Sequence, residues 1–187
     1  MDAFLDIKLL PDPEFAPSTL MNALFAKLHR ALVTHGAGDI GISFPDAGQN
    51  AHTLGQRLRL HGTSAALEKL MALQWTHGMH DHLIIRPIGK VPARCTYRHV
   101  RRVQAKSSPE RLRQRRMARQ GIDYPQACQE IPDHVAERLR LPYLIVTSRS
   151  TGQRFHLFIE QIEVSAQGGE ARFNQYGLGK ATPVPWF

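Results

Sequence analysis

The chain has 187 residues, of which 42% are hydrophobic, so it can form a folded core and is not a disordered tail. It carries 24 Lys and Arg against 16 Asp and Glu, a formal net charge of +8. No stretch approaches the roughly 18 apolar residues of a membrane span. The N-terminal segment is acidic where a secretory signal would be basic, and Cys95 and Cys128 form no disulfide framework. We therefore expect a cytoplasmic protein with free thiols.

The first part of the chain begins with a strand, a helix and a second strand. Residues 4–10 alternate between apolar and polar side chains, as a half-buried strand does. Ser18 is expected to cap a helix that ends near Gly36 and Gly38, and residues 39–44 (DIGISF) are typical of a strand. Helical spacing puts six apolar residues on one face, namely Leu20, Met21, Leu24, Phe25, Leu28 and Leu32.

The same pattern then repeats in the order strand, helix, strand. Residues 57–61 alternate, Thr63 or Ser64 is expected to cap a second helix, and residues 83–88 are typical of a fourth strand. The order β-α-β-β-α-β predicts a ferredoxin-like domain over residues 1–94, with a boundary near Pro92. Many RNA-binding modules share this plan, but a fold does not establish a function.

The rest of the chain predicts a smaller C-terminal α+β domain over residues 95–187. Residues 97–106 are typical of an extended segment that leads into an arginine-rich helix at about 108–120. A second helical stretch covers 124–139, with an interruption at Pro132. Strands are expected at 144–147 and 155–159, around a turn, and at 171–176.

Positive charge is concentrated between residues 101 and 119, RRVQAKSSPERLRQRRMAR. Against one acid, Glu110, this segment holds eight basic residues, so it carries +7 of the formal +8. Each Lys or Arg that neutralises a phosphate releases a counterion, so a local field of this kind favours a polyphosphate partner, and nucleic acid is the first hypothesis. The eight residues are Arg101, Arg102, Lys106, Arg111, Arg113, Arg115, Arg116 and Arg119.

The helical part of this segment has no apolar stripe to bury, because Leu112 and Met117 lie on different sides. One interpretation is a solvated helix or a disordered basic arm. The other is an ordered helix that lies in a groove of the partner. A cap at Ser107 or Ser108, Pro109 in the first turn and a stop at Gly121 favour the second interpretation.

The acidic residues are too scattered for two-metal phosphoryl chemistry, and we expect no metal and no cofactor. The only candidate metal cluster, His77, His80 and His82, lacks a clear fourth ligand, which favours solvated loop histidines.

Metal-free RNA cleavage needs a histidine that accepts the proton of a ribose 2′-OH. Of the ten histidines, His29 lies on the flank of the first helix, where one side can pack and the other can meet a ligand. Spacing alone favours an ordinary boundary histidine at this position and does not choose among the ten.

Several short motifs occur in an order and at intervals that closely resemble one known family. They are PDPEF, IGISFPD, LGQRLRLHG, RVQAKS with PERLR, IPDHVA, STGQRFHLFI, YGLGK and the terminal VPWF. The chain is similar over essentially its whole length to the CRISPR-associated repeat-processing endoribonucleases of the type I-F (Ypest) subtype. The resemblance implies binding of the CRISPR repeat stem-loop in pre-crRNA and metal-independent cleavage at the 3′ base of the hairpin through 2′-OH attack. The products are a 2′,3′-cyclic phosphate and a 5′-OH.

The resemblance also implies roles for individual residues. His29 matches the general base, Ser148 the serine that positions the nucleophilic ribose, and Tyr176 the tyrosine that orients the histidine. Arg102 and Gln104 match base readers, since arginine pairs with guanine and glutamine with adenine. Phe155 matches an aromatic residue that stacks on the terminal base pair, and Ser150 and Thr151 are expected near phosphate or sugar. Gln114 and Ala118 stand where some relatives have arginine, so individual helix contacts are open.

The resemblance implies that the enzyme stays on the mature crRNA hairpin with the other subunits of the type I-F surveillance complex of the Cascade type. Two alternatives remain open. One is a non-catalytic RNA-hairpin-binding subunit of a ribonucleoprotein, and the other is a basic DNA-binding regulator. A 2′-deoxy substitution upstream of the cleavage site separates the three, because only the ribonuclease needs that hydroxyl to cut.

Overall fold

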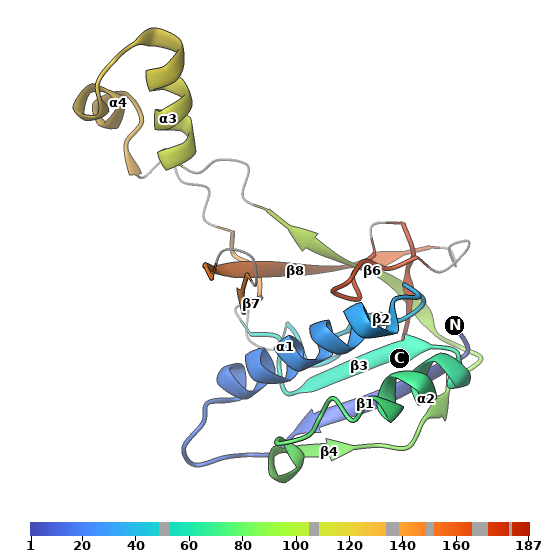
Figure 1. Cartoon of the computed structure of the whole chain (residues 1–187). Helices are drawn as coiled ribbons and strands as arrows, with labels where there is room; N and C mark the ends of the chain where they lie inside the picture. Colours follow the sequence, from blue (N-terminus) through green and yellow to red (C-terminus); the bar gives the residue numbers. More distant parts are fainter. Residues whose placement is uncertain (49–52, 105–108, 134–138, 149–151, 166–171, 180) are drawn as a thin grey trace. The chain divides into compact units, whose positions relative to one another are not determined.

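The computed structural model describes residues 1–48, 53–104, 109–133, 139–148, 152–165, 172–179 and 181–187. The chain forms two compact units, one made of Met1–Arg102 with Leu141–Phe187 and the other of Val103–Arg140. Two antiparallel sheets and four α-helices occur in the described residues, so the expected α+β class is confirmed (Figure 1). The expected division into domains 1–94 and 95–187 stays a prediction.

The first sheet, in the larger unit, has the strand order β2-β3-β1-β4, and β5 pairs with the start of β1. Neighbouring strands are antiparallel, with Ile7 of β1 opposite Leu58 of β3 on one side and Ile85 of β4 on the other. The four expected strands are confirmed to within a few residues. The bounds are β1 (Ala3–Leu9), β2 (Gly41–Ser43), β3 (Arg57–Gly62), β4 (Leu83–Ile85) and β5 (Gly89–Lys90).

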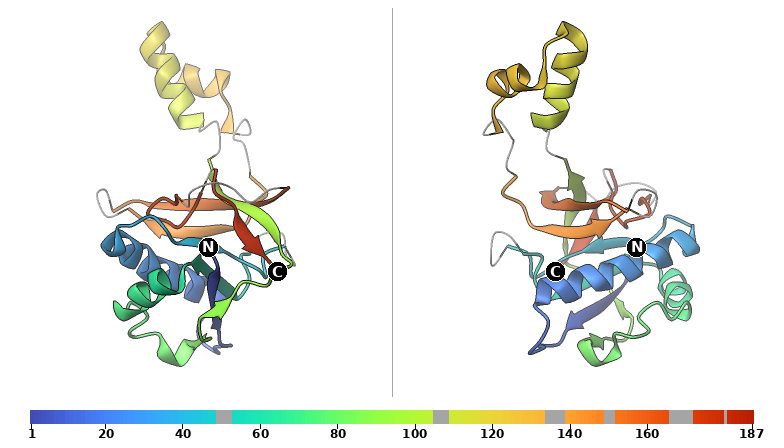
Figure 2. Two further views of the ribbon diagram at one scale, coloured as in Figure 1. Left: turned by 90° about the vertical axis from the view of Figure 1, so that its right-hand side faces the viewer. Right: turned by 60° about the vertical axis from the view of Figure 1, so that its left-hand side comes forward.

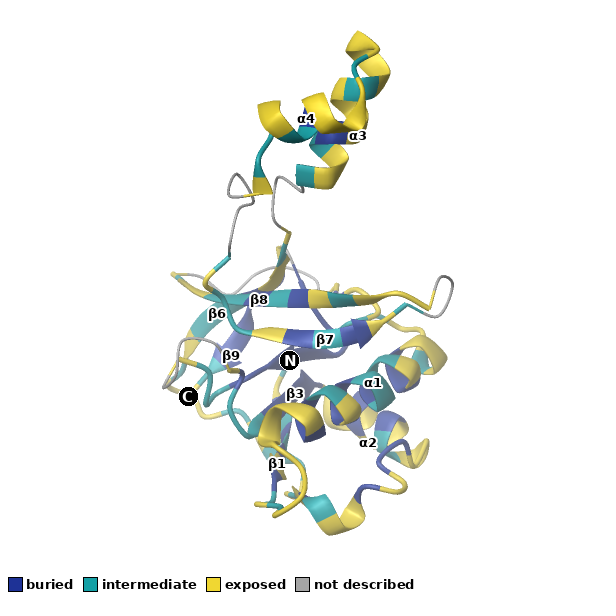
Figure 3. Cartoon of the chain, turned by 90° about the vertical axis from the view of Figure 1, so that its left-hand side faces the viewer, coloured by how far each residue is buried: buried dark blue, intermediate teal, exposed yellow. Residues whose placement is uncertain are grey.

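Two helices, α1 (Pro17–His35) and α2 (Ser64–Ala72), cover one face of this sheet (Figure 2). The alternation in β1 explains the packing, because Leu5, Ile7 and Leu9 are buried while the residues between them are not. All six apolar residues predicted for the inner face of α1 are buried. Figure 3 shows the buried residues in dark blue where the helices meet the sheet. A short 3₁₀ helix, η1 (His80–His82), precedes β4.

The residues at the helix ends explain where each helix begins and ends, and one predicted cap is wrong. Ser18 does not cap α1; Ala16 occupies the cap position, makes no side-chain hydrogen bond there, and is followed by Pro17. Proline suits this position because it has no N–H to satisfy and its φ is already helical. Gly36, at φ 72°, ends α1 as expected, and the Thr63 side chain accepts a hydrogen bond from the Ala66 amide at the start of α2.

The second sheet, also in the larger unit, has the strand order β7-β8-β6-β9. The strand expected at 171–176 is wrong: Phe173 and Asn174 have no strand structure, and Gln175 and Tyr176 form a turn. The edge strand β9, in the proline-rich C-terminal tail, was not expected. The bounds are β6 (Thr96–Val103), β7 (Tyr143–Thr147), β8 (Arg154–Val164) and β9 (Val184–Trp186).

The smaller unit contains α3 (Pro109–Gln120) and α4 (Tyr124–Glu130). Gly121 ends α3 as expected, at φ 66°, with its amide bonded to the Met117 carbonyl, and the Asp123 side chain caps α4. The expected caps Ser107 and Ser108, and most of the expected helix beyond Pro132, lie outside the described residues. None of the helices in the described ranges is both long and apolar enough to cross a membrane.

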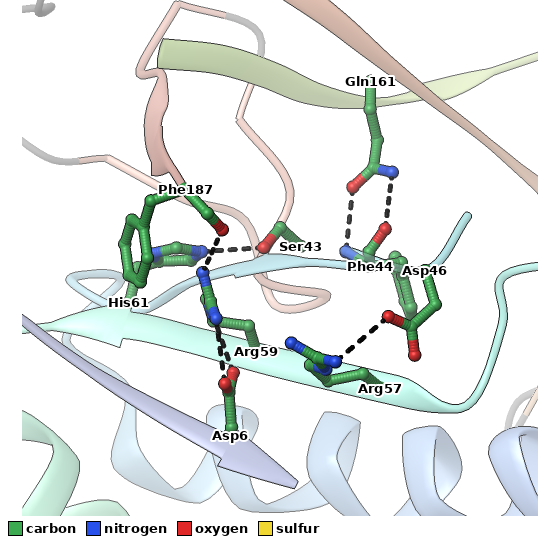
Figure 4. A network of polar contacts seen from close by, with 9 residues as sticks. All are labelled: Asp6, Ser43, Phe44, Asp46, Arg57, Arg59, His61, Gln161 and Phe187. Carbon is green, nitrogen blue, oxygen red and sulfur yellow. Dashed lines mark hydrogen bonds and ion pairs between the residues drawn. The ribbon is translucent and has the colours of Figure 1, made fainter. Parts of the chain in front are cut away.

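A polar network ties the C-terminus and the second sheet to the first sheet (Figure 4). Arg59 is 4% exposed, donates to both carboxylate oxygens of Asp6 at 2.7 and 2.9 Å, and donates to the Phe187 carbonyl at 3.0 Å. The Gln161 side chain of β8 bonds both the amide and the carbonyl of Phe44, just after β2. These contacts lie within the larger unit and hold its two sheets together.

Candidate active site and RNA-binding residues

His29 lies in α1, is half-buried, and has its ring fixed by a main-chain contact. Its Nδ1 lies 2.8 Å from the carbonyl oxygen of Gln175. A carbonyl oxygen can only accept, so Nδ1 carries the hydrogen. In the neutral ring the lone pair is then on Nε2, which has no hydrogen-bond partner among the described residues. The imidazole is therefore set in the tautomer that can accept a proton at Nε2.

The ring of Tyr176 stacks on the ring of His29. The two ring centroids are 4.3 Å apart and the planes are 11° from parallel. On α1, Phe25 lies one turn before His29 and is nearly parallel to Tyr176 at a centroid distance of 6.2 Å. Tyr176 thus lies along the side of α1 and limits rotation of the imidazole by ring contact.

The turn that carries Gln175 and Tyr176 is itself anchored. The Asn174 side chain accepts from the amides of Tyr176 and Leu178, at 2.8 and 3.1 Å. Gly177 has φ 71°, and a Cβ there would lie 2.7 Å from the Ile42 side chain, so this position requires glycine. The carbonyl of Gly177 accepts from the Ile42 amide of β2.

Asn174 and Gln175 are site residues that sequence reasoning missed. An asparagine three residues before a glycine is a known turn signal, and Asn174 with Gly177 fits it. Gln175 contacts His29 through its main-chain oxygen, and a main-chain contact cannot be predicted from the pattern of side chains in the sequence.

Ser148 directly follows β7, at the start of the connection to β8. Its amide donates to the Gln153 carbonyl, and its carbonyl accepts from the Gly152 amide, both at 2.8 Å. The hairpin is held against α1, because Asn22 of that helix accepts a hydrogen bond from the Ile145 amide of β7 at 2.9 Å (Figure 3). His29 and Ser148 therefore come from two elements that pack together. Ser150 and Thr151 lie outside the described residues.

Two of the residues expected to bind RNA meet on the second sheet. The Arg102 guanidinium lies over the Phe155 ring, 5.3 Å from its centroid. Arg102 is exposed and Phe155 is half-buried, so the pair presents a charged group over an aromatic face. Arg101 is engaged by Glu160, with a shortest contact of 2.8 Å. Gln104 is exposed just after β6, and Lys106 lies outside the described residues.

The arginines of α3 are not equivalent. Arg113 is 6% exposed and donates to the Ile131 carbonyl at 2.7 and 2.9 Å and to Asp133 at 2.6 Å. The hydrogen bond with Asp133 raises the pKa of Arg113. This arginine therefore joins α3 to the end of α4. Arg116 contacts Glu130 at 2.9 Å. Three further arginines are exposed and form no ion pair with any described residue: Arg111, Arg115 and Arg119.

The histidines of the candidate metal cluster make separate contacts. His82 Nδ1 lies 2.9 Å from an Asp12 carboxylate oxygen, and the ring centroids of His77 and His80 are 6.3 Å apart. Within the residues that the structure describes, no group of three or more His, Cys, Asp or Glu side chains is placed to hold a metal ion.

Comparison with known proteins identifies the family. A family model described as "CRISPR-associated protein (Cas_Csy4)" matches residues 4–187. A Pseudomonas aeruginosa (strain UCBPP-PA14) protein named "CRISPR-associated endonuclease Cas6/Csy4" is 48% identical over 187 residues, which is 100% of each chain. An Escherichia coli (strain UTI89 / UPEC) protein with the same name is 42% identical, again over 100% of each chain. With its full-length similarity to both proteins, this chain belongs to the CRISPR-associated Csy4 family.

Proposed function

We propose that this chain, an endoribonuclease of the Csy4 family, binds the CRISPR repeat stem-loop and cuts pre-crRNA at the 3′ base of the hairpin without a metal ion. The 2′-OH of the nucleotide before the scissile phosphate attacks that phosphate. The products are a 2′,3′-cyclic phosphate and a 5′-OH, and the enzyme stays on the mature hairpin. The observation that carries the proposal is the fixed imidazole of His29, with its Nε2 free of partners among the described residues.

In the proposed reaction, Nε2 of His29 accepts the proton as the 2′-oxygen bonds to phosphorus. The phosphorus–O5′ bond breaks, and the departing 5′-oxygen takes up a proton from water. The imidazolium that forms is stabilised by the Gln175 carbonyl, because its oxygen accepts the Nδ1 hydrogen in both protonation states. Tyr176 holds the ring plane, and the Ser148 hydroxyl positions the ribose.

RNA recognition is divided between base reading and phosphate binding. We assign base reading at the foot of the stem to Arg102 and Gln104, and stacking on the terminal base pair to Phe155. The exposed arginines of α3 bind phosphates of the RNA backbone, whereas Arg113 holds α3 and α4 together. The major groove of A-form RNA admits a helix only near the end of a stem, so a short hairpin is preferred over long duplex RNA. Contacts from Arg101, Arg116, Lys106, Ser150 and Thr151 complete the proposed interface.

The proposal includes a ferredoxin-like arrangement for the N-terminal part, which the strand order β2-β3-β1-β4 and two helices on one face support. It also includes a cytoplasmic location and association with the other subunits of the type I-F surveillance complex.

The decisive experiment uses the cognate repeat hairpin in EDTA, with and without a 2′-deoxy substitution at the nucleotide before the scissile phosphate. We expect the ribose substrate to be cut to the two stated product ends, and the deoxy substrate to bind equally well without being cut. Cleavage of the deoxy substrate at full rate would refute 2′-OH attack. Binding without cleavage of either RNA would favour the non-catalytic subunit.

A variant pair tests the assignment of the base. His29→Ala should bind the hairpin without cutting it, whereas His80→Ala, a change at an exposed histidine in η1, should cut normally. Rapid cleavage by His29→Ala would place the base on another residue.

A further inference from the structure

The larger unit contains a groove that the proposed hairpin contacts do not use. It has a volume of about 920 Å³ and lies between the first turns of α1, the segment before β3, and the β7–β8 hairpin. Its lining includes Thr147 and Arg154, which are paired with each other at the end of that hairpin. Ser148 is the next residue after Thr147, so the groove begins beside the serine proposed to hold the ribose at the cut.

The charge of the groove suits a phosphate backbone. Lys8, Arg57 and Arg154 all line it. Among the described residues that line the groove, Asp46 is the only acidic one, and it is paired with Arg57 at 3.4 Å; Lys8 and Arg154 form no ion pair with any described residue. The first turn of α1 also contains no acidic residue. The groove therefore carries net positive charge, with two lysine or arginine side chains available to an anion.

An aromatic side chain in the lining favours a single strand over a duplex. Tyr143 is 38% exposed, although its ring also contacts His156 at a centroid distance of 4.3 Å and Phe158 at 5.5 Å. These contacts brace the Tyr143 ring. Cations that follow a backbone, together with an aromatic face on which a base can stack, are the features by which proteins bind single-stranded nucleic acid. Bases inside a duplex are stacked on both faces and cannot use such a ring, which is open only to a terminal base pair or to an unpaired base.

We propose that this groove binds the single-stranded RNA on the 3′ side of the stem, the strand that leaves after cleavage. The assignment rests on the proposed function, because the position of the cut next to Ser148 fixes which strand reaches the groove. Lys8 and Arg154 contact phosphates of this strand, and Tyr143 stacks on one of its bases. The groove thereby holds the scissile phosphate between two anchored segments, the stem and the 3′ strand.

The test measures the affinity of the full chain for three forms of the cognate hairpin, each with a 2′-deoxy nucleotide that prevents cutting. One ends at the cut, one carries a 3′ single strand of about six nucleotides, and one carries the same strand at the 5′ end. We expect tighter binding only for the 3′ extension. The slope of log affinity against log salt should also steepen by about 0.7 for each added phosphate contact.

Matched variants assign this gain to the groove. The double variant Lys8→Ala/Arg154→Ala should lose the gain in affinity and in salt slope, while its affinity for the unextended hairpin is unchanged. The control, Lys69→Ala/Arg86→Ala, removes one exposed lysine and one exposed arginine elsewhere in the same unit and should keep the gain. Tyr143→Ser should lower the gain in affinity and leave the salt slope intact, because stacking releases no counterion.

Three results would overturn the proposal: no gain from the 3′ extension, an equal or larger gain from the 5′ extension, or a gain that survives in the Lys8 and Arg154 variant. A gain in affinity that survives in the Lys8 and Arg154 variant is also the result expected if the groove binds a protein segment instead of RNA. Failure to bind the unextended hairpin would instead count against the proposed function itself.

Discussion

His29 and Gln175 are 146 positions apart in sequence, yet the imidazole Nδ1 of one and the carbonyl oxygen of the other are 2.8 Å apart. This contact joins α1 to the turn at residues 174–177 and sets which ring nitrogen carries the hydrogen. Because the acceptor is a main-chain oxygen, no substitution of the Gln175 side chain removes it directly. The residues that hold the turn are therefore the ones through which the site can be perturbed.

Tyr176 acts on His29 through its ring, and the described residues include no hydrogen bond from the tyrosine hydroxyl to the imidazole. Tyr176→Phe should therefore retain most of the cleavage rate, whereas Tyr176→Ala should lower it by about 10² because the imidazole is no longer held in place. Single-turnover rates on the cognate hairpin, with binding measured in parallel, check both. A large loss in Tyr176→Phe would mean that the hydroxyl acts directly.

Arg113 and Arg115 lie two residues apart on α3 but should fail in different ways. Arg113→Ala removes the bonds to the Ile131 carbonyl and Asp133, so it should lower the melting temperature and the helix content of the smaller unit. Arg115→Ala should leave melting unchanged and instead weaken RNA binding and reduce its salt slope. Thermal melts by circular dichroism and binding at several salt concentrations separate the two. Identical behaviour of the variants would contradict the division.

Breaking the pair of Arg59 and Asp6 should destabilise the larger unit. Arg59→Met leaves the Asp6 carboxylate, 14% exposed, without its partner, and we expect a loss of about 3–5 kcal/mol in the free energy of unfolding. Adding Asp6→Ala should recover part of that loss, since the unpaired charge is then gone. Urea unfolding followed by the fluorescence of Trp75 and Trp186, both in this unit, measures the difference. A loss below about 1 kcal/mol in the free energy of unfolding would mean that the pair of Arg59 and Asp6 contributes no more than an exposed ion pair does.

His61 should make stability depend on pH. Burial, and then the charge of Arg59, lower the pKa of His61 from 6.5 to about 3 in the folded chain. Between pH 6.5 and 3 the unfolded chain binds a proton that the folded chain does not. The stabilisation is therefore complete above pH 6.5 and is lost as the pH falls, by about 2 kcal/mol at pH 5.

The comparison of wild type with His61→Gln isolates this effect, because every other titrating group is the same in both. Urea unfolding at pH 7 and pH 5 should show a smaller fall for His61→Gln, which can keep a hydrogen bond to Ser43. Parallel pH dependence in the two proteins would mean that His61 titrates normally when folded.

Periodicity predicted much of the first sheet and its helices, because alternation in β1 and helical spacing in α1 reflect burial directly. It failed where the chain is irregular. The prediction of a strand at 171–176 is wrong because Phe173 is buried beside Gly41, whose missing side chain leaves room for the ring. The three residues of β9 include Pro185 and are too few to show alternation.

The candidate site was predictable only in part. Helical spacing placed His29 on the flank of α1, and the structure shows one side of its ring packed by Tyr176. The contact to Gln175 depends on chain folding over a long separation and leaves no pattern in the sequence. Charge alone likewise predicts that Arg113 binds RNA like the other α3 arginines. The structure shows that Arg113 instead bonds to Ile131 and Asp133 within the smaller unit.

The contacts of Arg59 with Phe187 affect how the larger unit unfolds locally. Arg59 holds Phe187 by its carbonyl and by its ring, 4.0 Å from the guanidinium, and Phe187 directly follows β9, which pairs with β6 of the second sheet. Fraying of the last strand must therefore break contacts in the centre of the first sheet. Amide hydrogen exchange should find β3 and β6 opening together, as one cooperative element.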